Sequence, residues 1–191
     1  MPNNVAAPHV ADATQRSVQR YSASAQVSHW LLALLIFALY IMGWYMVEIP
    51  KKTPPVAFWY NLHKSIGLVA VLPIVYLIWW RLRHKAPPLP VTMPRWEISA
   101  SKLNHTLFYI CLIVMTLSGF LESSFTKWGI KFFGLPLPSV FWEDKNISSI
   151  FNEIHFYASY LFIVLIGIHV LAALKHWLID RDGVFQRMLP R

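Results

Sequence analysis

Four long stretches of the chain are almost wholly apolar, and shorter polar segments separate them. The stretches are Ser28 to Val47, Leu62 to Trp80, Leu103 to Leu121 and Ile154 to Leu178. A helix needs roughly 20 mostly apolar residues to cross the hydrocarbon core of a bilayer, and each stretch is about that long. The pattern therefore predicts an all-α protein, a bundle of four transmembrane helices.

The polar segments divide the chain into three parts. We predict a mobile leader over residues 1–20, a membrane domain over residues 21–180 and an interfacial tail over residues 181–191. No small-residue cleavage site follows the first apolar stretch, so that stretch is interpreted as a retained helix. The proline-rich segment 84–97 is expected to be an extended loop. The aromatic segment from Glu122 to Glu153 is expected to be a long loop on the outer membrane surface.

The composition supports a membrane protein and excludes a nucleic-acid-binding one. The chain is 56% hydrophobic and only 14% charged, whereas soluble domains carry about 25% charged residues. The net charge of +8 does not come from one basic stripe. Lys and Arg lie instead at the ends of the apolar stretches, as membrane topology requires.

Lys and Arg are divided unequally between the two ends of the predicted bundle. Loops rich in Lys and Arg remain in the cytoplasm. The richer end holds both termini, so we predict that both termini are cytoplasmic. Its basic residues are Arg16, Arg20, Arg81, Arg83, Lys85, Arg95, Lys102, Lys175, Arg181, Arg187 and Arg191, against Lys51, Lys52, Lys64, Lys127, Lys131 and Lys145 at the other end.

Four histidines lie in or at the edge of the apolar stretches, namely His29, His63, His155 and His169. An ionisable side chain in a membrane segment is costly and by default indicates function. Imidazole is a frequent ligand of haem iron. The single cysteine, Cys111, lies in no C-x-x-C-H motif, so any haem would be bound without thioether links. These residues favour electron transfer through non-covalently bound haem.

The predicted directions of the helices decide which histidines can meet. His63 and His155 begin their helices at the outer end, whereas His29 lies at the cytoplasmic end. His169 is fourteen residues beyond His155, about 21 Å deeper at ~1.5 Å per residue, and within about 40° of the same helix face. We therefore predict two bis-histidine haems, held by His63 with His155 and by His29 with His169. Any one histidine alone could be an interfacial hydrogen-bonding group; four at two matched depths favour metal ligands.

Two further histidines and two glycines have open interpretations. His105 either contacts a haem propionate or is merely interfacial. His176 either serves a quinone, by bonding its carbonyl or relaying a proton, or is likewise interfacial. Gly67 and Gly167 could make room for a flat macrocycle, although glycine is common in membrane helices.

Several short motifs resemble the bacterial cytochrome b561 family from Tyr21 onward. They are YSASAQVSHW, LHKSIG, NHTLFY, the spacing H-x13-H-x6-H of His155, His169 and His176, and the ending DGVFQRMLPR. The resemblance implies a four-helix protein of the bacterial inner membrane with two haem b groups, whose ligands fall on the four histidines above. Members studied as superoxide oxidases take electrons from periplasmic superoxide and reduce ubiquinone.

The resemblance suggests candidates for the quinone site. The family often carries an arginine late in the second helix, where this chain has Leu77 and retains Arg81. Arg81, His105 and His176 are the candidate quinone-site residues.

We weigh three functions. The leading one is a superoxide:ubiquinone oxidoreductase in which Lys51, Lys52 and Lys64 steer the superoxide anion; these lysines could equally be interfacial anchors. The second is an electron-transfer cytochrome b subunit for a dehydrogenase, a hydrogenase or another redox partner protein. The third is a metal or proton transporter that uses the histidines. The colour of the purified protein separates the third from the others, and copurification of a partner favours the second.

Overall fold

The computed structural model describes residues 19–50 and 53–190. The predicted leader is therefore described only from Gln19 onward, and Lys51 and Lys52, two of the three candidate steering lysines, lie outside the described residues. Arg191 does as well.

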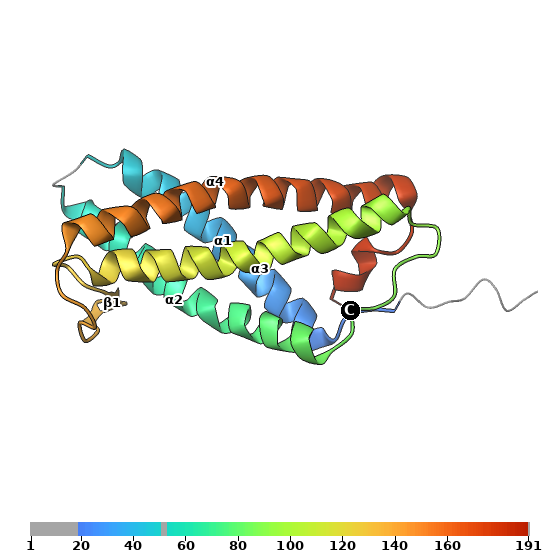
Figure 1. The fold of residues 1–191 in the computed structure, drawn as a ribbon, viewed down its shortest axis with the longest axis horizontal. Coiled ribbons are helices and arrows are strands. Elements are labelled where there is room, and N and C mark those ends of the chain that lie inside the picture. Colours follow the sequence, from blue (N-terminus) through green and yellow to red (C-terminus); the bar gives the residue numbers. More distant parts are fainter. Residues whose placement is uncertain (1–18, 51–52, 191) are drawn as a thin grey trace, which may run out of the picture.

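Four helices dominate the described chain (Figure 1). Each is long and apolar enough to cross a membrane, so the predicted all-α, four-helix transmembrane fold is confirmed. They are α1 (Ala23–Glu48), α2 (Pro54–Arg83), α3 (Arg95–Ser124) and α4 (Lys145–Lys175), and α4 continues through a π-helical turn, η2 (His176–Asp180).

The helices extend beyond the apolar stretches, so the predicted loops were too long. The α2–α3 connection is residues 84–94 and the α3–α4 connection is residues 125–144. Local capping explains the earlier starts: Pro54 occupies the first turn of α2, where its missing N–H costs nothing. Asp144 caps α4 by accepting from the backbone N–H groups of Asn146 and Ile147. Apolar length identifies only the part of a helix within the lipid.

The α3–α4 connection contains a small antiparallel hairpin of β1 (Lys131–Phe132) and β2 (Leu135–Pro136). Ser65 of α2 is fully buried and attaches this hairpin. Its hydroxyl accepts from the N–H of Phe133, at 2.8 Å, and its one hydrogen is shared between the carbonyls of Asn61, at 2.7 Å, and Lys131, at 3.1 Å. The aromatic segment predicted as a loop is thus partly helical and is folded back onto the bundle.

The bundle is built from two helix pairs. α1 packs along α2 and α3 packs along α4, while α2 meets α3 over a shorter region. The buried apolar core draws on all four helices and consists of Leu32, Ala70, Ile74, Cys111, Leu112, Phe162 and Leu165. Phe162 is seven residues from both His155 and His169, so part of this core lies between the levels of those two histidines.

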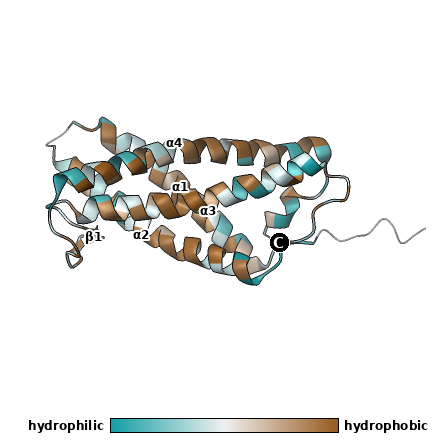
Figure 2. Cartoon of the chain, viewed as in Figure 1, coloured by the Kyte–Doolittle hydropathy of each residue, from teal (hydrophilic) through white to brown (hydrophobic). Residues whose placement is uncertain are grey.

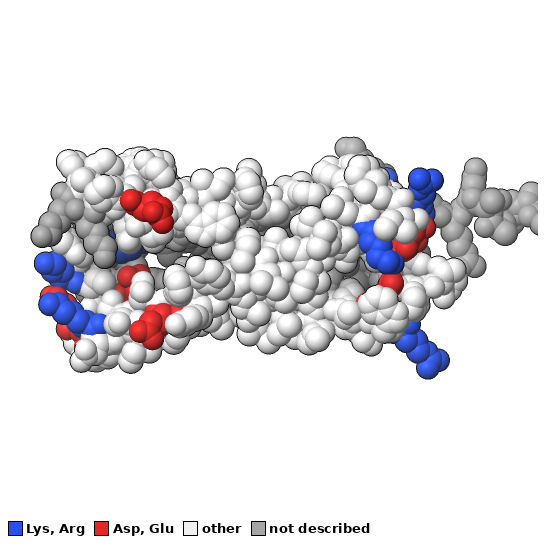
Figure 3. Space-filling view, turned by 90° about the horizontal axis from the view of Figure 1, so that it is seen from above, with Lys and Arg blue, Asp and Glu red and all other residues white. Residues whose placement is uncertain are grey.

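Charged side chains gather at the two ends of the molecule and leave the middle bare in the view of Figure 3. Figure 2 shows the same division, with apolar residues along the middle of the helices. We call the end with the β1–β2 hairpin the hairpin end, and the end with the C-terminus, and the start of α1, the termini end. The uncharged belt between them fits the hydrocarbon core of a bilayer.

After α4 the chain turns back towards α1. Arg181 and Gly183 adopt positive φ angles, and a 3-10 turn, η3 (Phe185–Met188), follows. Trp30 donates to the carbonyl of Met188 at 2.6 Å, and Gln26 donates to that of Arg187 at 2.9 Å. The tail therefore ties the end of α4 to the start of α1.

Candidate functional site

The structure brings the four predicted ligand histidines together as two pairs. The rings of His63 on α2 and His155 on α4 have centroids 6.4 Å apart at the hairpin end. The rings of His29 on α1 and His169 on α4 have centroids 6.3 Å apart towards the termini end. In both cases one histidine comes from α1 or α2 and the other comes from α4. These are the partners predicted from the sequence.

The spacing of each pair fits two imidazoles on opposite sides of one metal ion. A metal–imidazole nitrogen bond is about 2 Å. Because a ring nitrogen lies about 1 Å from its ring centre, such ligands have centroids about 6 Å apart. The observed centroid distances of 6.3 Å and 6.4 Å are therefore those expected for two imidazoles that share one metal ion.

His155 is held with one nitrogen free for a ligand. Its Nδ1 lies 3.0 Å from the carbonyl oxygen of Met115 and 3.3 Å from the hydroxyl of Ser118, both on α3. Because a carbonyl only accepts, Nδ1 donates its hydrogen to Met115. This leaves Nε2 without a hydrogen and free to coordinate a metal, the arrangement by which proteins orient metal-binding histidines.

Gly119 makes room for the His155 ring. A Cβ atom at Gly119 would lie 3.1 Å from both Cε1 and Nδ1 of His155, which is too close for ordinary packing. At Gly67 and Gly167, which the sequence suggested, a Cβ would meet no protein atom within 4 Å, so the space beside both glycines is open. Gly119 of α3 is a further glycine that bears on a histidine, and the sequence did not single it out.

His29 carries a buried Nδ1 atom that finds no hydrogen-bond partner in residues 19–50 and 53–190. A polar atom left unpaired in apolar surroundings is costly. The ring is therefore suited to binding a group that the polypeptide itself does not supply.

The three candidate quinone-site residues are not equivalent in position. The ring of His105 lies 5.5 Å from that of His169, and its Nδ1 lies 2.7 Å from the carbonyl of Ser101. His176 is two helical turns beyond His169 along α4. Arg81 is exposed in the last turn of α2. His105 and His176 lie on α3 and at the end of α4, whereas Arg81 lies on α2.

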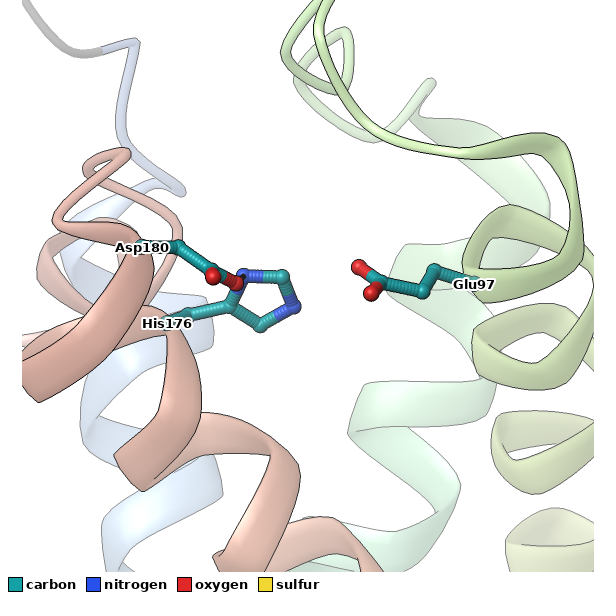
Figure 4. Close-up of side chains that lie close together, drawn as sticks. All are labelled: Glu97, His176 and Asp180. Atoms are coloured by element: carbon teal, nitrogen blue, oxygen red, sulfur yellow. Dashed lines mark ion pairs between the residues drawn. The ribbon is translucent and has the colours of Figure 1, made fainter.

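A charged cluster surrounds His176 at this end. Ligand atoms of Glu97, His176 and Asp180 lie within 4.8 Å of one another (Figure 4). The ammonium of Lys175 lies 3.0 Å from Glu97 and 2.6 Å from Asp180. A cation of the protein's own thus occupies the position between the two carboxylates, and the cluster is not assigned as a metal site.

An open cleft of about 360 Å³ lies at the hairpin end. Its lining includes Glu122, Lys127 and Lys145. Glu122 is one helical turn beyond Ser118, which contacts His155. The cleft therefore reaches to within about 6 Å, at ~1.5 Å per residue, of the position along α3 that supports His155. Only a small molecule fits a space of this size.

Lys64, the one candidate steering lysine within the described residues, lies beside this region. Its ammonium is 3.4 Å from the carbonyl of Gly129 in the α3–α4 connection. It directly follows His63 in the chain and is half-buried.

Comparison with known proteins assigns the family. A family model described as prokaryotic cytochrome b561 matches residues 20–191. The chain belongs to this family. Three relatives cover nearly the same length, each over 91% of this chain. Cytochrome b561 homolog 2 of Escherichia coli K12 is 29% identical, over 93% of that relative; homolog 1 is 23% identical, over 99%; and the probable superoxide oxidase CybB of Yersinia pestis is 24% identical, over 97%.

Membership of the cytochrome b561 family makes this protein a membrane electron carrier, and the family implies haem b. The resemblance inferred from the short motifs is confirmed. The two histidine pairs fit that cofactor in spacing, in the free Nε2 of His155 and in the unpaired nitrogen of His29.

Several functional residues of this cytochrome were not predicted from the sequence. Ser118 and Gly119 are adjacent in α3, and both lie against His155. The only sequence signal for them was two small residues side by side in an apolar helix. Asp182 binds His176 through the turn that follows α4. Nothing in the spacing of these residues revealed that contact, because it depends on how the chain reverses at Arg181.

Proposed function

We propose that this cytochrome b561 oxidises superoxide at the hairpin end and reduces ubiquinone at the termini end. In this proposal His63 and His155 hold one haem b, and His29 and His169 hold a second. When bound, each haem would supply a site that takes up and releases one electron. The observation that carries the proposal is the presence of two histidine pairs of equal spacing towards opposite ends of one bundle.

The proposed orientation puts the hairpin end outside and both termini in the cytoplasm of a bacterial cell, with the protein in the inner membrane. The excess of Lys and Arg at the termini end supports it. Residues 1–20 are then a cytoplasmic leader, residues 21–180 the membrane domain and residues 181–191 a cytoplasmic tail.

The overall reaction needs protons on one side only. Two superoxide anions lose one electron each and become two molecules of oxygen, without releasing a proton. One ubiquinone takes up those two electrons and two protons and becomes ubiquinol. The hairpin end therefore has to admit and release a small anion, while the termini end has to supply protons.

Two features of the hairpin end support a small anionic donor. The cleft next to Glu122 ends one turn above the Ser118 contact with His155 and has room for a small molecule. Lys127 and Lys145 line the cleft together with Glu122 and Glu143, and the half-buried Lys64 lies nearby. Local positive charge of this kind raises the encounter rate of an anion. The relative named as a probable superoxide oxidase, 24% identical to this chain, adds support from its name alone.

At the termini end we propose that quinone binds on the α3–α4 side, near His105 and His176. His105 lies against the ring of His169, and His176 can present a nitrogen to a carbonyl oxygen. Arg81, in the last turn of α2, would contact a quinone that also reaches that helix.

The test is a stopped-flow measurement of haem absorbance in two steps. The oxidised protein is first mixed with superoxide alone, and then with a ubiquinone. We expect haem reduction that outpaces the spontaneous dismutation of superoxide, followed by reoxidation by quinone. If superoxide fails to reduce the protein while a copurifying dehydrogenase succeeds, the protein is instead an electron-transfer subunit. If the purified protein contains no haem, the assignment fails and a transporter becomes the better account.

A further inference from the structure

Ser118 places a buried hydroxyl in the apolar part of α3, in contact with a proposed haem ligand. The residue is 2% exposed, and its Oγ lies 3.3 Å from Nδ1 of His155 on α4. A polar group buried among apolar side chains is costly unless it is hydrogen-bonded. The contacts of this hydroxyl therefore decide whether it is tolerated at this depth.

The hydroxyl of Ser118 is oriented differently from other hydroxyls on the same helix. Thr116 and Ser124 each donate to the carbonyl four residues earlier, over 2.7 Å and 2.8 Å, the usual bond of a hydroxyl within a membrane helix. Ser118 instead contacts the carbonyl of Met115, three residues earlier and 3.3 Å away. In this position its oxygen lies against the ring of His155.

The hydrogens of this small network can be assigned from the chemistry of its members. The carbonyl of Met115 can only accept, and it lies 3.0 Å from Nδ1 of His155. The one hydrogen of the Ser118 hydroxyl also points to that carbonyl, so the lone pairs of Oγ face the Nδ1–H group. Nδ1–H of His155 is therefore shared between two acceptors, the carbonyl oxygen and the hydroxyl oxygen.

The second histidine pair differs in this respect. Nδ1 of His29 is buried and has no hydrogen-bond partner among residues 19–50 and 53–190. The ring centroids of the two pairs are nearly equally spaced, at 6.4 Å and 6.3 Å. The two proposed haem sites are thus alike in ligand spacing and unlike in the hydrogen bonding of a ligand.

We propose that Ser118 is a positioning residue that lowers the reduction potential of the haem held by His63 and His155. This inference rests on the proposed function, which places a haem b between those two histidines. An acceptor on Nδ1–H makes the imidazole a more basic ligand, and a more basic ligand favours the oxidised, more positively charged iron. Hydrogen bonding around the ligands is one of the means by which proteins set haem potentials.

A lower potential at the hairpin end favours electron flow towards the termini end. Each transfer oxidises the site of His63 and His155 by one electron and reduces the site of His29 and His169 by one. Ser118 takes no part in the transfer and acts only through His155. Its contribution is therefore visible in the potential itself, without any substrate.

The test is a potentiometric measurement on the purified, haem-loaded protein, followed by the electron paramagnetic resonance of the oxidised haems, with neither superoxide nor quinone added. The resonance of a bis-histidine haem depends on the angle between its imidazole planes. That angle is 78° for His63 and His155 and 52° for His29 and His169, so two signals are expected. The signal that is missing from His63→Ala identifies the haem at the hairpin end.

The variants separate the hydroxyl from general packing. Ser118→Ala removes the acceptor, and Ser118→Thr keeps a hydroxyl. Ser124→Ala is the matched control, because it removes another buried hydroxyl of α3, one that bonds to the carbonyl of Phe120.

We expect Ser118→Ala to raise the ratio of reduced to oxidised haem at the hairpin end about fivefold at a fixed potential, the effect of one neutral hydrogen bond. This corresponds to about 40 mV, since a tenfold change is about 59 mV for a one-electron couple. The resonance signal should stay the same, because the carbonyl of Met115 still orients the ring. Ser118→Thr and Ser124→Ala should remain close to the wild type, and the second haem should not shift.

Three results would overturn the inference. An unchanged potential in Ser118→Ala would show that the hydroxyl does not act on His155. Equal shifts of both haems, or an equal shift in Ser124→Ala, would show a general effect of packing. A shift with an altered resonance signal would mean that Ser118 sets the angle of the ring and not its basicity.

The outcome for the proposed function is read separately. If His63→Ala removes no haem signal, the assignment of that haem fails, and this inference fails with it. If Ser118→Ala shifts the potential as expected but superoxide does not reduce the wild-type protein, only the proposed function fails.

Discussion

The Nδ1 atom of His155 lies 3.0 Å from the main-chain carbonyl oxygen of Met115, on the neighbouring helix. This one contact fixes the tautomer of the ring, because the carbonyl can only accept. It also fixes the ring's orientation, since Ser118 and Gly119 border the same face. His63 then lies opposite, with its ring centroid 6.4 Å away. The proposed haem site at the hairpin end is thus shaped by α3, which supplies none of its ligands.

The pairing of the histidines predicts which substitutions remove the same haem. His63→Ala and His155→Ala should each deplete the haem at the hairpin end and leave the other, because each removes one of two axial ligands. His29→Ala and His169→Ala should do the reverse. The measurement is haem content per chain together with a redox titration that resolves the two centres. Loss of one and the same centre from His63→Ala and His169→Ala would contradict the pairing.

The close approach of Gly119 predicts a position-specific effect of a single methyl group. Gly119→Ala would place a Cβ atom 3.1 Å from His155, and overpacking of this kind costs about 1–3 kcal/mol. We expect weaker retention, or a shifted midpoint potential, of the haem at the hairpin end only. Leu117→Ala, a change on the exposed side of the same helix, is the control. Equal effects of the two substitutions on both haems would argue against a specific role for Gly119.

The distribution of Lys and Arg predicts the topology. Alkaline phosphatase, which is active only in the periplasm, should be silent when fused after Arg191. The same reporter inserted next to the exposed Ser139 of the α3–α4 connection should be active. The opposite pattern would exchange the two sides in every functional assignment made above.

Positive charge near His63 predicts a salt-dependent rate of reduction by superoxide. Neutralising Lys51, Lys52 and Lys64 to Gln should slow haem reduction. The wild-type rate should also fall with ionic strength, because exposed charges are screened over about 10 Å at 0.1 M salt. Stopped-flow haem absorbance measures both effects, and Lys102→Gln, at the termini end, is the control. A rate that ignores both salt and the three substitutions would leave these lysines as interfacial anchors only.

The amino-acid sequence alone determined the number of membrane helices and the depth of each histidine. Apolar stretches of about 20 residues have few alternatives in lipid, where backbone groups must be satisfied within a helix. The fourteen residues between His155 and His169 set a fixed rise and a common face, so the two pairs followed from helix direction. Motifs such as LHKSIG and the ending DGVFQRMLPR were enough to indicate the family.

The tertiary structure alone decided what surrounds those histidines. A helix that is apolar on every side carries no periodic signal for which side faces lipid and which faces the bundle. The sequence therefore did not single out Gly119, which the rotation of α3 brings to His155. Likewise, Asp182 reaches His176 only because the chain widens into a π-turn and reverses at Arg181. Contacts of this kind depend on the angle at which helices and turns meet, which neither length nor spacing encodes.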